Sequence, residues 1–379
     1  MKILFAGGGT GGHINPALAI AGYVKEQRPD TEILFVGSKG GMEERLVPLA
    51  GYSIRTVTVA GFRRKLNWQG IKHNVAAVGK VFAATAQSEK ILKEFQPDLC
   101  VGTGGYVCGP VLRKAAKMGI PVLVHESNAF PGVTTKMLSK LVTKILVALP
   151  DAGKRLDPSV QNKIVVTGNP VRGEMLFADK QKSRHELGLD ERPVILSVGG
   201  SLGAENINRA MAEVMVESAK DDSRQHIHAY GQYGKWFPDL LREKGVALED
   251  HPNLDVREYI NDMPRCMAAA DLVICRAGAM AISELQVQGK PAIMIPSPNV
   301  AENHQYYNAL ALSEKGAGEL IEEKDLTGEK LCTLVKEMLS DPEKLRSYGK
   351  NAAQLAIFDA NERIFRLICE TLEAQGKTW

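Results

Sequence analysis

Short apolar runs alternate with amphipathic or loop segments along the first half of the chain. Continuous apolar runs of this kind indicate buried strands, and several of the segments between them carry helical spacing. The alternation predicts parallel βα units with helices on both faces of a sheet. The strands expected in this half lie at residues 3–6, 33–36, 54–59, 99–101, 122–124 and 145–147.

The pattern reaches a junction and then starts again. The turn residues Gly168-Asn169-Pro170 and a polar stretch at 179–184 indicate a domain boundary. We therefore predict an α/β fold with two doubly wound, Rossmann-like domains that face each other across a cleft. The strands expected after the boundary lie at residues 194–198, 227–229, 272–274 and 292–295. The predicted domains are 1–168 and 169–345, followed by C-terminal helices at 346–379 that can pack back on the N-terminal domain.

Both predicted domains open with a strand, a glycine turn and a helix. In the first, the loop Gly7 to His13 precedes a helix that we expect to carry Pro16 in its first turn. Glycines let the backbone approach a ligand, and the helix dipole behind them favours an anion, most often phosphate. In the second, Gly199 to Ala204 form the turn, and Ser201 can donate its hydroxyl to a phosphate. A third turn, Gly102 to Pro110, is either a plain βα turn or a second anion-binding wall.

Three known motifs are matched only in part. Residues 7–12 fit the dinucleotide fingerprint, but the second strand ends at Ser38-Lys39 without the acidic residue that would hold a ribose. Residues 199–203 fit the nucleophile elbow of hydrolases, which would leave the first glycine loop without a role. His125-Glu126 begins like a zinc motif, but Ala129 stands where the second histidine is needed. We favour phosphate binding at both loops and expect no bound metal.

The strand at 271–275 leads into a helix that should begin near Ala279. Its first N–H groups would lie at the ligand-binding edge of the sheet, and Glu284 falls within its first two turns. A carboxylate there can accept hydrogen bonds from both hydroxyls of a ribose, while the helix start takes the phosphates. The alternative is an ordinary surface glutamate.

Charge divides the chain into unlike halves. The net charge is +3, but residues 1–168 contain 22 Lys and Arg against 11 Asp and Glu, a net +11, whereas the remainder carries −8. A basic half favours an anionic partner such as nucleic acid, an acidic membrane or a phosphorylated substrate, unless its lysines are merely scattered and solvated. At 379 residues, with 44% hydrophobic and 24% charged residues, the chain suits two soluble domains.

The cysteines and the lengths of the apolar runs indicate the cellular compartment in which the protein is expected. The six cysteines form no CxxC pair, and several lie in apolar runs, as in a reducing cytoplasm. The N-terminal run ends at the glycine loop and is unlike a signal peptide. No apolar stretch approaches the roughly 20 residues that span a bilayer. Any membrane association is therefore expected to be peripheral.

Residues 62–82 combine basic and apolar side chains. Arg63, Arg64 and Lys65 precede a helical pattern that places Ile71, Val75, Val78 and Phe82 on one side. Such a segment fits an interfacial membrane contact, although an ordinary core-facing helix has the same spacing. The basic bias of this half favours the membrane interpretation.

Seven short motifs follow one another along the chain: Gly8-Gly9-Thr10-Gly11-Gly12-His13, Gly104-Gly105-Tyr106-Val107, His125-Glu126-x-Asn128-Ala129, Gly168-Asn169-Pro170-Val171-Arg172, Gly199-Gly200-Ser201-x-Gly203-Ala204, Arg276-Ala277-Gly278-Ala279 and Gln305-Tyr306-x-Asn308-Ala309. In this order they resemble the MurG family of peptidoglycan synthesis, and the resemblance runs essentially end to end. Seven ordered motifs are far more specific than any one of them.

The resemblance implies a glycosyltransferase fold of the B type. It implies inverting transfer of GlcNAc from UDP-GlcNAc to the C4 hydroxyl of the muramoyl sugar of lipid I, which gives lipid II. The enzyme would work peripherally at the cytoplasmic face of the inner membrane, against an anionic lipid surface, without a cofactor, a metal or a nucleic-acid partner. A UDP-GlcNAc epimerase on the same fold and a non-catalytic nucleotide-sugar sensor are the alternative functions.

The family's donor contacts carry over residue by residue as implications of the resemblance. Asn128 and Gln305 would touch the sugar, and Glu284 the ribose. The backbone of Ile260 would read the uracil edge. Ser127 departs from the family, which commonly has Gln there, and His304 stands where some members have a second Gln, so the sugar contacts differ in detail. The other implied substrate-binding residues are Thr10, Gly11, Gly12, Arg172, Ser201, Ala279, Met280, Ala281, Ile282 and Ser283.

A base must take the proton of the acceptor hydroxyl. His13, at the edge of the first glycine loop, is our candidate, because an imidazole titrates near neutral pH. The alternative is a structural histidine that bonds the loop backbone.

Overall fold

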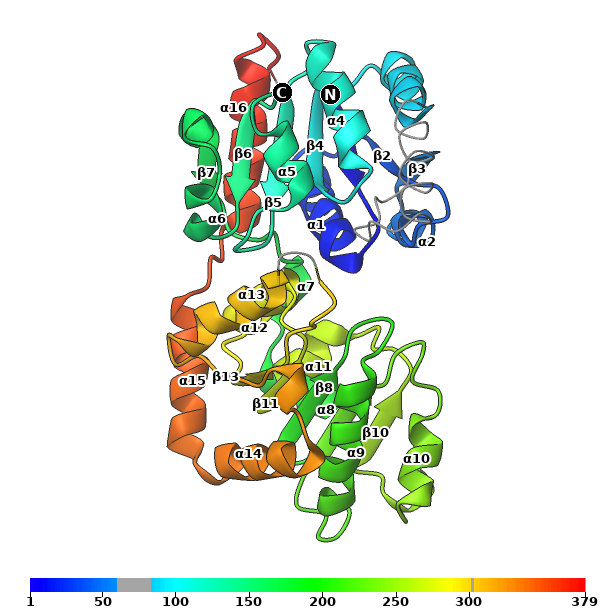
Figure 1. Ribbon diagram of the computed structural model, residues 1–379, viewed down its shortest axis with the longest axis vertical. Coiled ribbons are helices and arrows are strands. Elements are labelled where there is room, and N and C mark those ends of the chain that lie inside the picture. Colours follow the sequence, from blue (N-terminus) through cyan, green and yellow to red (C-terminus); the bar gives the residue numbers. More distant parts are fainter. Residues whose placement is uncertain (60–82, 301–302, 379) are drawn as a thin grey trace, which may run out of the picture. The chain divides into compact units, whose positions relative to one another are not determined.

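The computed structural model describes residues 1–59, 83–300 and 303–378 and divides into two compact units (Figure 1). The first unit comprises Met1–Val171 and Asp359–Trp379, and the second comprises Arg172–Phe358. Each unit is built on a parallel sheet whose strands alternate with helices along the chain. The predicted α/β class with two doubly wound domains is confirmed.

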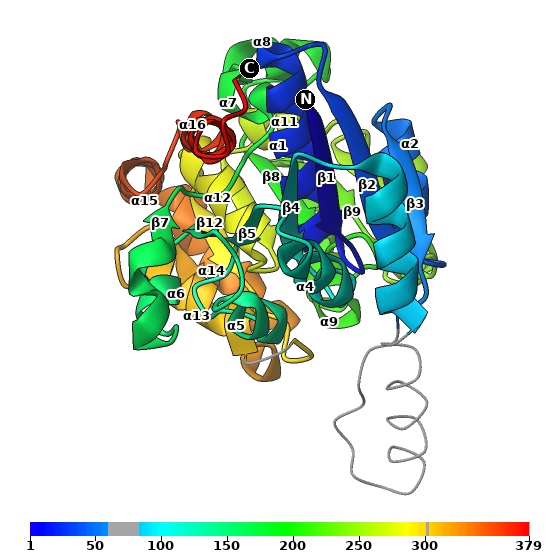
Figure 2. The same cartoon turned by 90° about the horizontal axis from the view of Figure 1, so that it is seen from above.

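Sheet A of the first unit has seven parallel strands in the order β3-β2-β1-β4-β5-β6-β7 (Figure 2). The chain builds outward from β1 to β3 and then returns to place β4 on the other side of β1. The point at which the winding direction reverses therefore lies between β1 and β4. The strands are β1 (Lys2–Gly7), β2 (Glu32–Ser38), β3 (Ser53–Val57), β4 (Leu99–Gly104), β5 (Val122–Glu126), β6 (Lys144–Val147) and β7 (Ile164–Val166).

Helices α1 and α16 close one face of sheet A, although they come from opposite ends of the chain. Apolar residues of α16 share a buried cluster with those of β1 and α1. The rings of Phe5 and Phe35 stack within this cluster with centroids 5.3 Å apart. The helices of the unit are α1 (Gly11–Gln27), α2 (Glu43–Leu49), a helical segment at 83–95, α4 (Cys108–Lys117), α5 (Val133–Leu138), α6 (Pro150–Lys154), η1 (Pro158–Lys163) and α16 (Ala360–Glu373).

Sheet B of the second unit has six parallel strands in the order β10-β9-β8-β11-β12-β13. It repeats the plan of sheet A, so its reversal lies between β8 and β11. The strands are β8 (Val194–Val198), β9 (Gln225–Ala229), β10 (Leu254–Arg257), β11 (Leu272–Cys275), β12 (Ala292–Met294) and β13 (Glu319–Leu320). The helices are α7 (Gly173–Phe177), α8 (Lys180–Glu186), α9 (Glu205–Ser218), α10 (Phe237–Glu243), η2 (Leu248–Asp250), α11 (Met263–Ala269), α12 (Ala279–Val287), α13 (His304–Ser313), η4 (Glu323–Asp325), α14 (Gly328–Ser340) and α15 (Pro342–Gln354).

The expected position of Pro16 is wrong. Helix α1 begins at Gly11, so this proline lies in the second turn. The Thr10 carbonyl accepts from the N–H groups of His13 and Ile14, at 3.0 and 3.1 Å. The last residues of the glycine loop therefore already form the first helical turn, which brings His13 onto the helix.

The C-terminal helices divide between the two units. Helix α15 packs on α12 within the second unit, and α16 packs on α1 within the first. The chain passes from the first unit to the second between Val171 and Arg172. The domain boundary expected at residue 168 lies close to this point and stays a prediction.

The amphipathic basic segment 62–82 lies outside the described residues. Within the ranges that the structure does describe, no helix is both long and apolar enough to cross a membrane.

Candidate functional site

Each sheet has one reversal of winding direction, and ligands of open α/β sheets bind at such a point, outside the carboxyl ends of the strands. The flanking strands are β1 and β4 in sheet A, and β8 and β11 in sheet B. The three glycine-rich turns and the segment before α12 follow these four strands directly. The geometry therefore marks one candidate cluster in each unit.

Glu43, the first residue of α2, holds the first glycine loop. Its side chain is fully buried. One carboxylate oxygen accepts from the Gly9 N–H at 3.1 Å, and the other accepts from the Ser38 N–H at 2.7 Å. The carboxylate occupies space that side chains would otherwise fill, because a Cβ would overlap Glu43 at Gly8, Gly37 and Gly41.

This contact changes what the loop can offer a ligand. The N–H of Gly9 already has an acceptor inside the protein. The N–H groups of Gly11 and Gly12 occupy the first two helical positions of α1, where no carbonyl of the helix can accept. The predicted contacts at Thr10, Gly11 and Gly12 thus lie at the helix start rather than within the loop before it.

His13 has a fixed ring at the reversal point of sheet A. Its Nδ1 lies 3.1 Å from the Gly8 carbonyl oxygen and 3.3 Å from the Thr10 hydroxyl. A carbonyl oxygen can only accept, so Nδ1 carries the hydrogen in the first contact and Nε2 carries the lone pair of the neutral ring. Thr103 donates its hydroxyl to the His13 carbonyl at 2.7 Å. A Cβ at Gly104, where φ is +113°, would overlap the ring.

Asn128 sits in a loop that Glu126 organises from the end of β5. One carboxylate oxygen of Glu126 accepts from the backbone and side-chain nitrogens of Asn128, both at 3.1 Å. The other accepts from the Gly132 N–H at 2.8 Å and the Thr135 hydroxyl at 2.7 Å. One amide hydrogen of Asn128 is therefore used inside the loop, which fixes the orientation of its side chain.

His125 has a structural setting. It is buried, its Nε2 lies 3.0 Å from the Gly168 carbonyl, and burial lowers its pKa. Asn169 donates to the Ser127 carbonyl at 3.2 Å. These two contacts tie the Gly-Asn-Pro junction to the end of β5 and to the loop after it.

In the second unit, α12 begins at Ala279 as predicted, with extended Gly278 as its N-cap. Ile282 N–H bonds back to Gly278 at 3.0 Å, so the first N–H groups of the helix have no intrahelical acceptor. The side chains of Met280 and Ile282 are buried. Those two residues can therefore offer a ligand only their backbone.

Arg172 and Glu284 are brought together although they are far apart in sequence. Burial raises the pKa of the Glu284 carboxyl to about 7, and the Arg172 cation partly opposes this shift. Arg172 is exposed at the start of α7. The pair places one cation and one titratable carboxyl beside the first turns of α12.

The remaining predicted donor residues lie around sheet B. Ser201 is exposed in the turn after β8, and its carbonyl accepts from Gln232 at 3.2 Å. Ile260 follows β10 and is buried, so only its backbone could face a uracil. The Gln305 side-chain oxygen on α13 accepts from the Ser297 N–H at 2.9 Å, which fastens the loop after β12.

Sequence reasoning missed Glu43 and assigned no role to Glu126. Both are buried carboxylates whose two oxygens accept hydrogen bonds from groups near the carboxyl ends of strands. The signal for Glu43 was available in the neighbouring glycines Gly37, Gly40 and Gly41, which are more than a tight turn needs.

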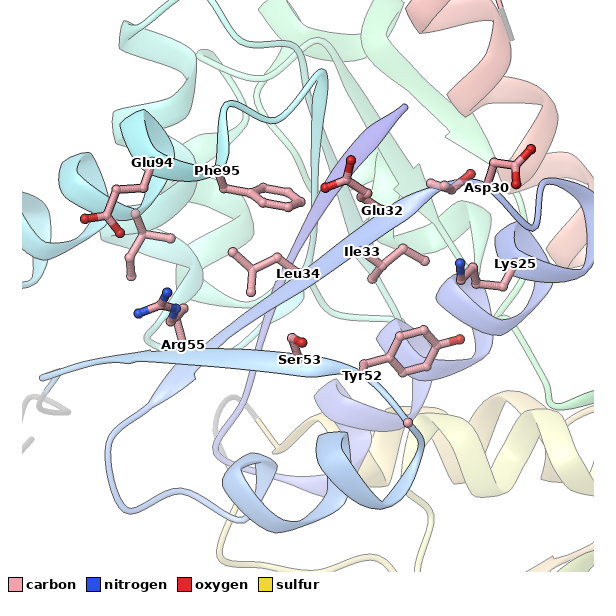
Figure 3. Close-up of a pocket in the computed structure, with 13 residues that line it drawn as sticks. Lys25, Asp30, Glu32, Ile33, Leu34, Tyr52, Ser53, Arg55, Glu94 and Phe95 are labelled. Carbon is pink, nitrogen blue, oxygen red and sulfur yellow. The ribbon is translucent and has the colours of Figure 1, made fainter.

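A cavity of about 630 Å³ lies in the first unit, away from the glycine loops (Figure 3). It is lined by residues at the amino ends of β2 and β3, including Glu32, Leu34 and Arg55, and by Glu94 and Phe95 of the segment 83–95. Because ligands of such sheets bind at the carboxyl ends, we do not assign the active site to this cavity. Among residues 1–59, 83–300 and 303–378, no three His, Cys, Asp or Glu side chains group as a metal site would require.

Comparison with known families matches both halves of the chain. The N-terminal domain model of glycosyltransferase family 28 matches residues 3–147, and the C-terminal domain model of that family matches residues 194–364.

Relatives match almost the whole chain. The Acetivibrio thermocellus UDP-N-acetylglucosamine--N-acetylmuramyl-(pentapeptide) pyrophosphoryl-undecaprenol N-acetylglucosamine transferase is 45% identical over 374 residues, 98% of this chain and 99% of that protein. The Clostridioides difficile protein of the same name is 43% identical over 96% of this chain and 89% of its own length.

Among solved structures, Acinetobacter baumannii MurG has a TM-score of 0.72 at 28% identity, covering 97% of this chain and 98% of that one. A Neisseria meningitidis UDP-GlcNAc 2-epimerase bound to UDP-GlcNAc has a TM-score of 0.67 at 15% identity, covering 99% of this chain and 100% of that one. At that identity it shows the fold alone.

Proposed function

The chain belongs to glycosyltransferase family 28 and, within it, to the MurG family, and from this membership we propose its reaction. It is an N-acetylglucosaminyltransferase that moves GlcNAc from UDP-GlcNAc to the muramoyl sugar of lipid I and so forms lipid II. The observation that carries this conclusion is the 45% identity, over 98% of the chain, to a transferase named for that donor and acceptor. The acceptor atom in our proposal is the C4 hydroxyl, and transfer inverts the anomeric carbon.

The proposed donor site is the cluster of the second unit. Arg172, Ser201 and the start of α12 bind the diphosphate, and the Glu284 carboxylate accepts from the ribose hydroxyls. As the bond to the anomeric carbon breaks, negative charge grows on the departing UDP. Oriented N–H groups, a hydroxyl and a guanidinium stabilise such charge without reorganising during the reaction. The other proposed donor contacts are Ile260, Ala279, Met280, Ala281, Ile282, Ser283 and Gln305.

The proposed base is His13. Its Nδ1–H bond to the Gly8 carbonyl leaves the lone pair on Nε2, which is the state a base requires. The structural role considered from the sequence is thus present as well, and it supports the catalytic role because it orients the ring. Thr10, Gly11, Gly12 and Asn128 then face the reacting sugars.

The proposed membrane contact lies on the first unit and faces anionic lipid at the cytoplasmic side. The net +11 of residues 1–168 supports it. Val133, Met137 and Leu141 recur every four residues along α5 and the following turn, with exposed fractions of 57, 64 and 46%. The exposed Lys136 and Lys140 lie between them in sequence. Exposed apolar residues beside cations suit the interface of an anionic bilayer.

The experiment that tests the reaction is incubation with UDP-GlcNAc and a lipid I analogue. Transfer gives UDP and a disaccharide product. Free UDP with an epimerised sugar would instead indicate the epimerase, and binding without turnover would indicate the sensor.

For the base, His13→Ala should lower kcat by about 10²–10⁴-fold, the usual contribution of a positioned base. The exposed His185 on α8 supplies the control, since His185→Ala should leave kcat unchanged. Near-normal turnover of His13→Ala would remove this residue as the base.

For the membrane contact, Met137→Asp should weaken co-sedimentation with phosphatidylglycerol vesicles while leaving UDP binding intact. Each Lys or Arg near such a surface contributes about 1 kcal/mol, so raising the salt concentration should weaken binding as well. Phe177→Asp, at an exposed apolar residue of the second unit, is the control. Equal effects of both substitutions would contradict the assignment.

A further inference from the structure

We propose that Glu43 is a positioning residue that tunes His13 through the single peptide group between Gly8 and Gly9. The inference rests on the proposed role of His13 as the base. It adds a residue 30 positions away in sequence that does not belong to any of the seven motifs.

Both hydrogen bonds of that peptide group are made inside the protein. Its N–H, on Gly9, donates to Oε2 of Glu43 at 3.1 Å. Its carbonyl, on Gly8, accepts from Nδ1 of His13 at 3.1 Å. The N–H and C=O of a trans peptide point in opposite directions. The carboxylate and the imidazole therefore lie on opposite sides of one polarisable group.

The carboxylate has no freedom to move away. It is fully buried, and its second oxygen accepts from the Ser38 N–H at 2.7 Å. Residues 8, 37 and 41 are glycines whose missing Cβ atoms leave the space it occupies. On the other side, a Cβ at Gly105 would overlap the Gly8 carbonyl oxygen, so the β4–α4 turn packs directly against this peptide.

A fixed carboxylate strengthens the opposite end of the peptide as an acceptor, because hydrogen bonds in a chain polarise one another. The Gly8 carbonyl then holds the Nδ1–H more firmly and stabilises the imidazolium that forms when Nε2 takes a proton. An acidic residue bonded directly to a catalytic histidine has this effect in hydrolase triads. Here a peptide group stands between the two side chains.

Other titratable groups on the packed segments are few. Lys39 is exposed in the turn after β2, Glu44 and Arg45 are exposed on α2, and Tyr106 is exposed on the β4–α4 turn. The Cys108 Sγ lies 3.0 Å from the Ala6 carbonyl oxygen and 3.1 Å from that of Gly104, either of which can accept its single hydrogen. Burial raises the pKa of this thiol to about 12, so it stays neutral. Of these groups, Glu43 alone has a hydrogen bond to the Gly8–Gly9 peptide, whose carbonyl holds the His13 ring.

The test compares Glu43→Gln, which keeps the shape, removes the charge and replaces one of the two accepting oxygens with an amide nitrogen, with Glu44→Gln on the exposed neighbour. We expect Glu43→Gln to lower the acidic pKa of the kcat profile by about one unit, a tenfold change in the protonation equilibrium. The KM for UDP-GlcNAc should not change. Glu43→Asp should restore most of the wild-type profile, and Glu44→Gln should match wild type throughout. An unshifted profile for Glu43→Gln overturns the proposal.

A direct measurement keeps the test independent of turnover. The His13 Cε1–H resonance, assigned with His13→Ala, reports the pKa of the ring in each full-length variant at low temperature. The proposal requires a lower His13 pKa in Glu43→Gln than in wild type, and an equal pKa refutes it. If His13→Ala keeps its turnover while this pKa still shifts, the base assignment fails and the coupling stands. If His13→Ala is inactive and the His13 pKa is the same in Glu43→Gln as in wild type, the base assignment stands and the coupling fails.

Discussion

Glu284 shows how burial and a neighbouring cation together set the chemistry of one residue. Its carboxyl is partly withdrawn from water near the start of α12, which favours the neutral acid and raises its pKa to about 7. The Arg172 guanidinium favours the carboxylate and limits the rise. In the free protein the group is therefore half-protonated near neutral pH.

If Glu284 accepts from the ribose as proposed, donor affinity must depend on pH. The carboxylate is the better acceptor, so UDP-GlcNAc should bind more tightly as pH rises through about 7 and lose affinity below it. Each pH unit below the pKa leaves about tenfold less carboxylate and weakens Kd by up to that factor. Calorimetric titration of UDP-GlcNAc between pH 5.5 and 8.5 measures this, and the donor itself has no phosphate that titrates strongly there.

The matched variants are Glu284→Gln and Glu174→Gln. The first should weaken binding at pH 8 by about tenfold or more, the value of a hydrogen bond to a charged group, and flatten the pH dependence. The second neutralises an exposed carboxylate on α7 close to Arg172 in sequence and should keep the wild-type curve. A pH dependence that survives in Glu284→Gln would assign the titration to another group.

The position of a residue that directly follows a strand could be predicted, whereas a neighbour brought from another element could not. Thr10, Ser201 and Ala279 lie on strand-turn-helix units whose pattern is local. Glu43 reaches Gly9 across 34 residues, because β2 pairs with β1 and carries the start of α2 alongside the loop. The spacing of apolar residues in a single sequence does not predict that Glu43 lies beside Gly9.

At the scale of elements, the strands that escaped prediction are β7, β10 and β13. All three lie at sheet edges, where every residue except Leu254 is only partly buried. β10 and β13 carry no continuous apolar run, which was the signal used. β7 is apolar throughout, but its three residues lead directly into Thr167 and the Gly-Asn-Pro turn, and only the turn was interpreted. The inner strands, such as β1 and β4, are buried along nearly their whole length and were identified from that run.

The packing of α2 against β2 can be tested at Gly37. A Cβ there would overlap the Glu43 side chain and lie 3.1 Å from Ile54 Cδ1. Gly37→Ala should destabilise the first unit by about 1–3 kcal/mol, the usual cost of overpacking. Gly22 in the interior of α1 has open space, so Gly22→Ala should instead stabilise by about 0.5–1 kcal/mol. Denaturant unfolding of both variants measures the contrast, and a Gly37→Ala variant as stable as the wild type would refute the packing argument.

At the scale of the whole molecule, the second unit is an insertion in the first. The chain leaves the first unit after Val171 and returns at Asp359 to add α16. The apolar positions of this helix could be predicted from their spacing, but spacing does not say which sheet they cover. Their buried partners lie in β1 and α1. The first unit therefore completes its core only when the last residues of the chain are in place.

A substitution at Ile368 tests whether α16 completes the core of the first unit, because this residue is fully buried in the cluster that α16 shares with α1. Ile368→Ala should lower the stability of the first unit by about 2–5 kcal/mol through lost transfer energy and a residual cavity. Arg366→Ala, on the exposed side of the same helix, removes only an i,i+4 ion pair with Glu370 and should cost about 0.3–0.5 kcal/mol. Calorimetric unfolding with and without UDP-GlcNAc assigns the transitions, since a ligand raises the stability of the unit that binds it. The transition that UDP-GlcNAc raises should be unaffected by Ile368→Ala, and the other should fall. A single transition that both treatments move would mean that the two units unfold together, so that the insertion couples their stabilities.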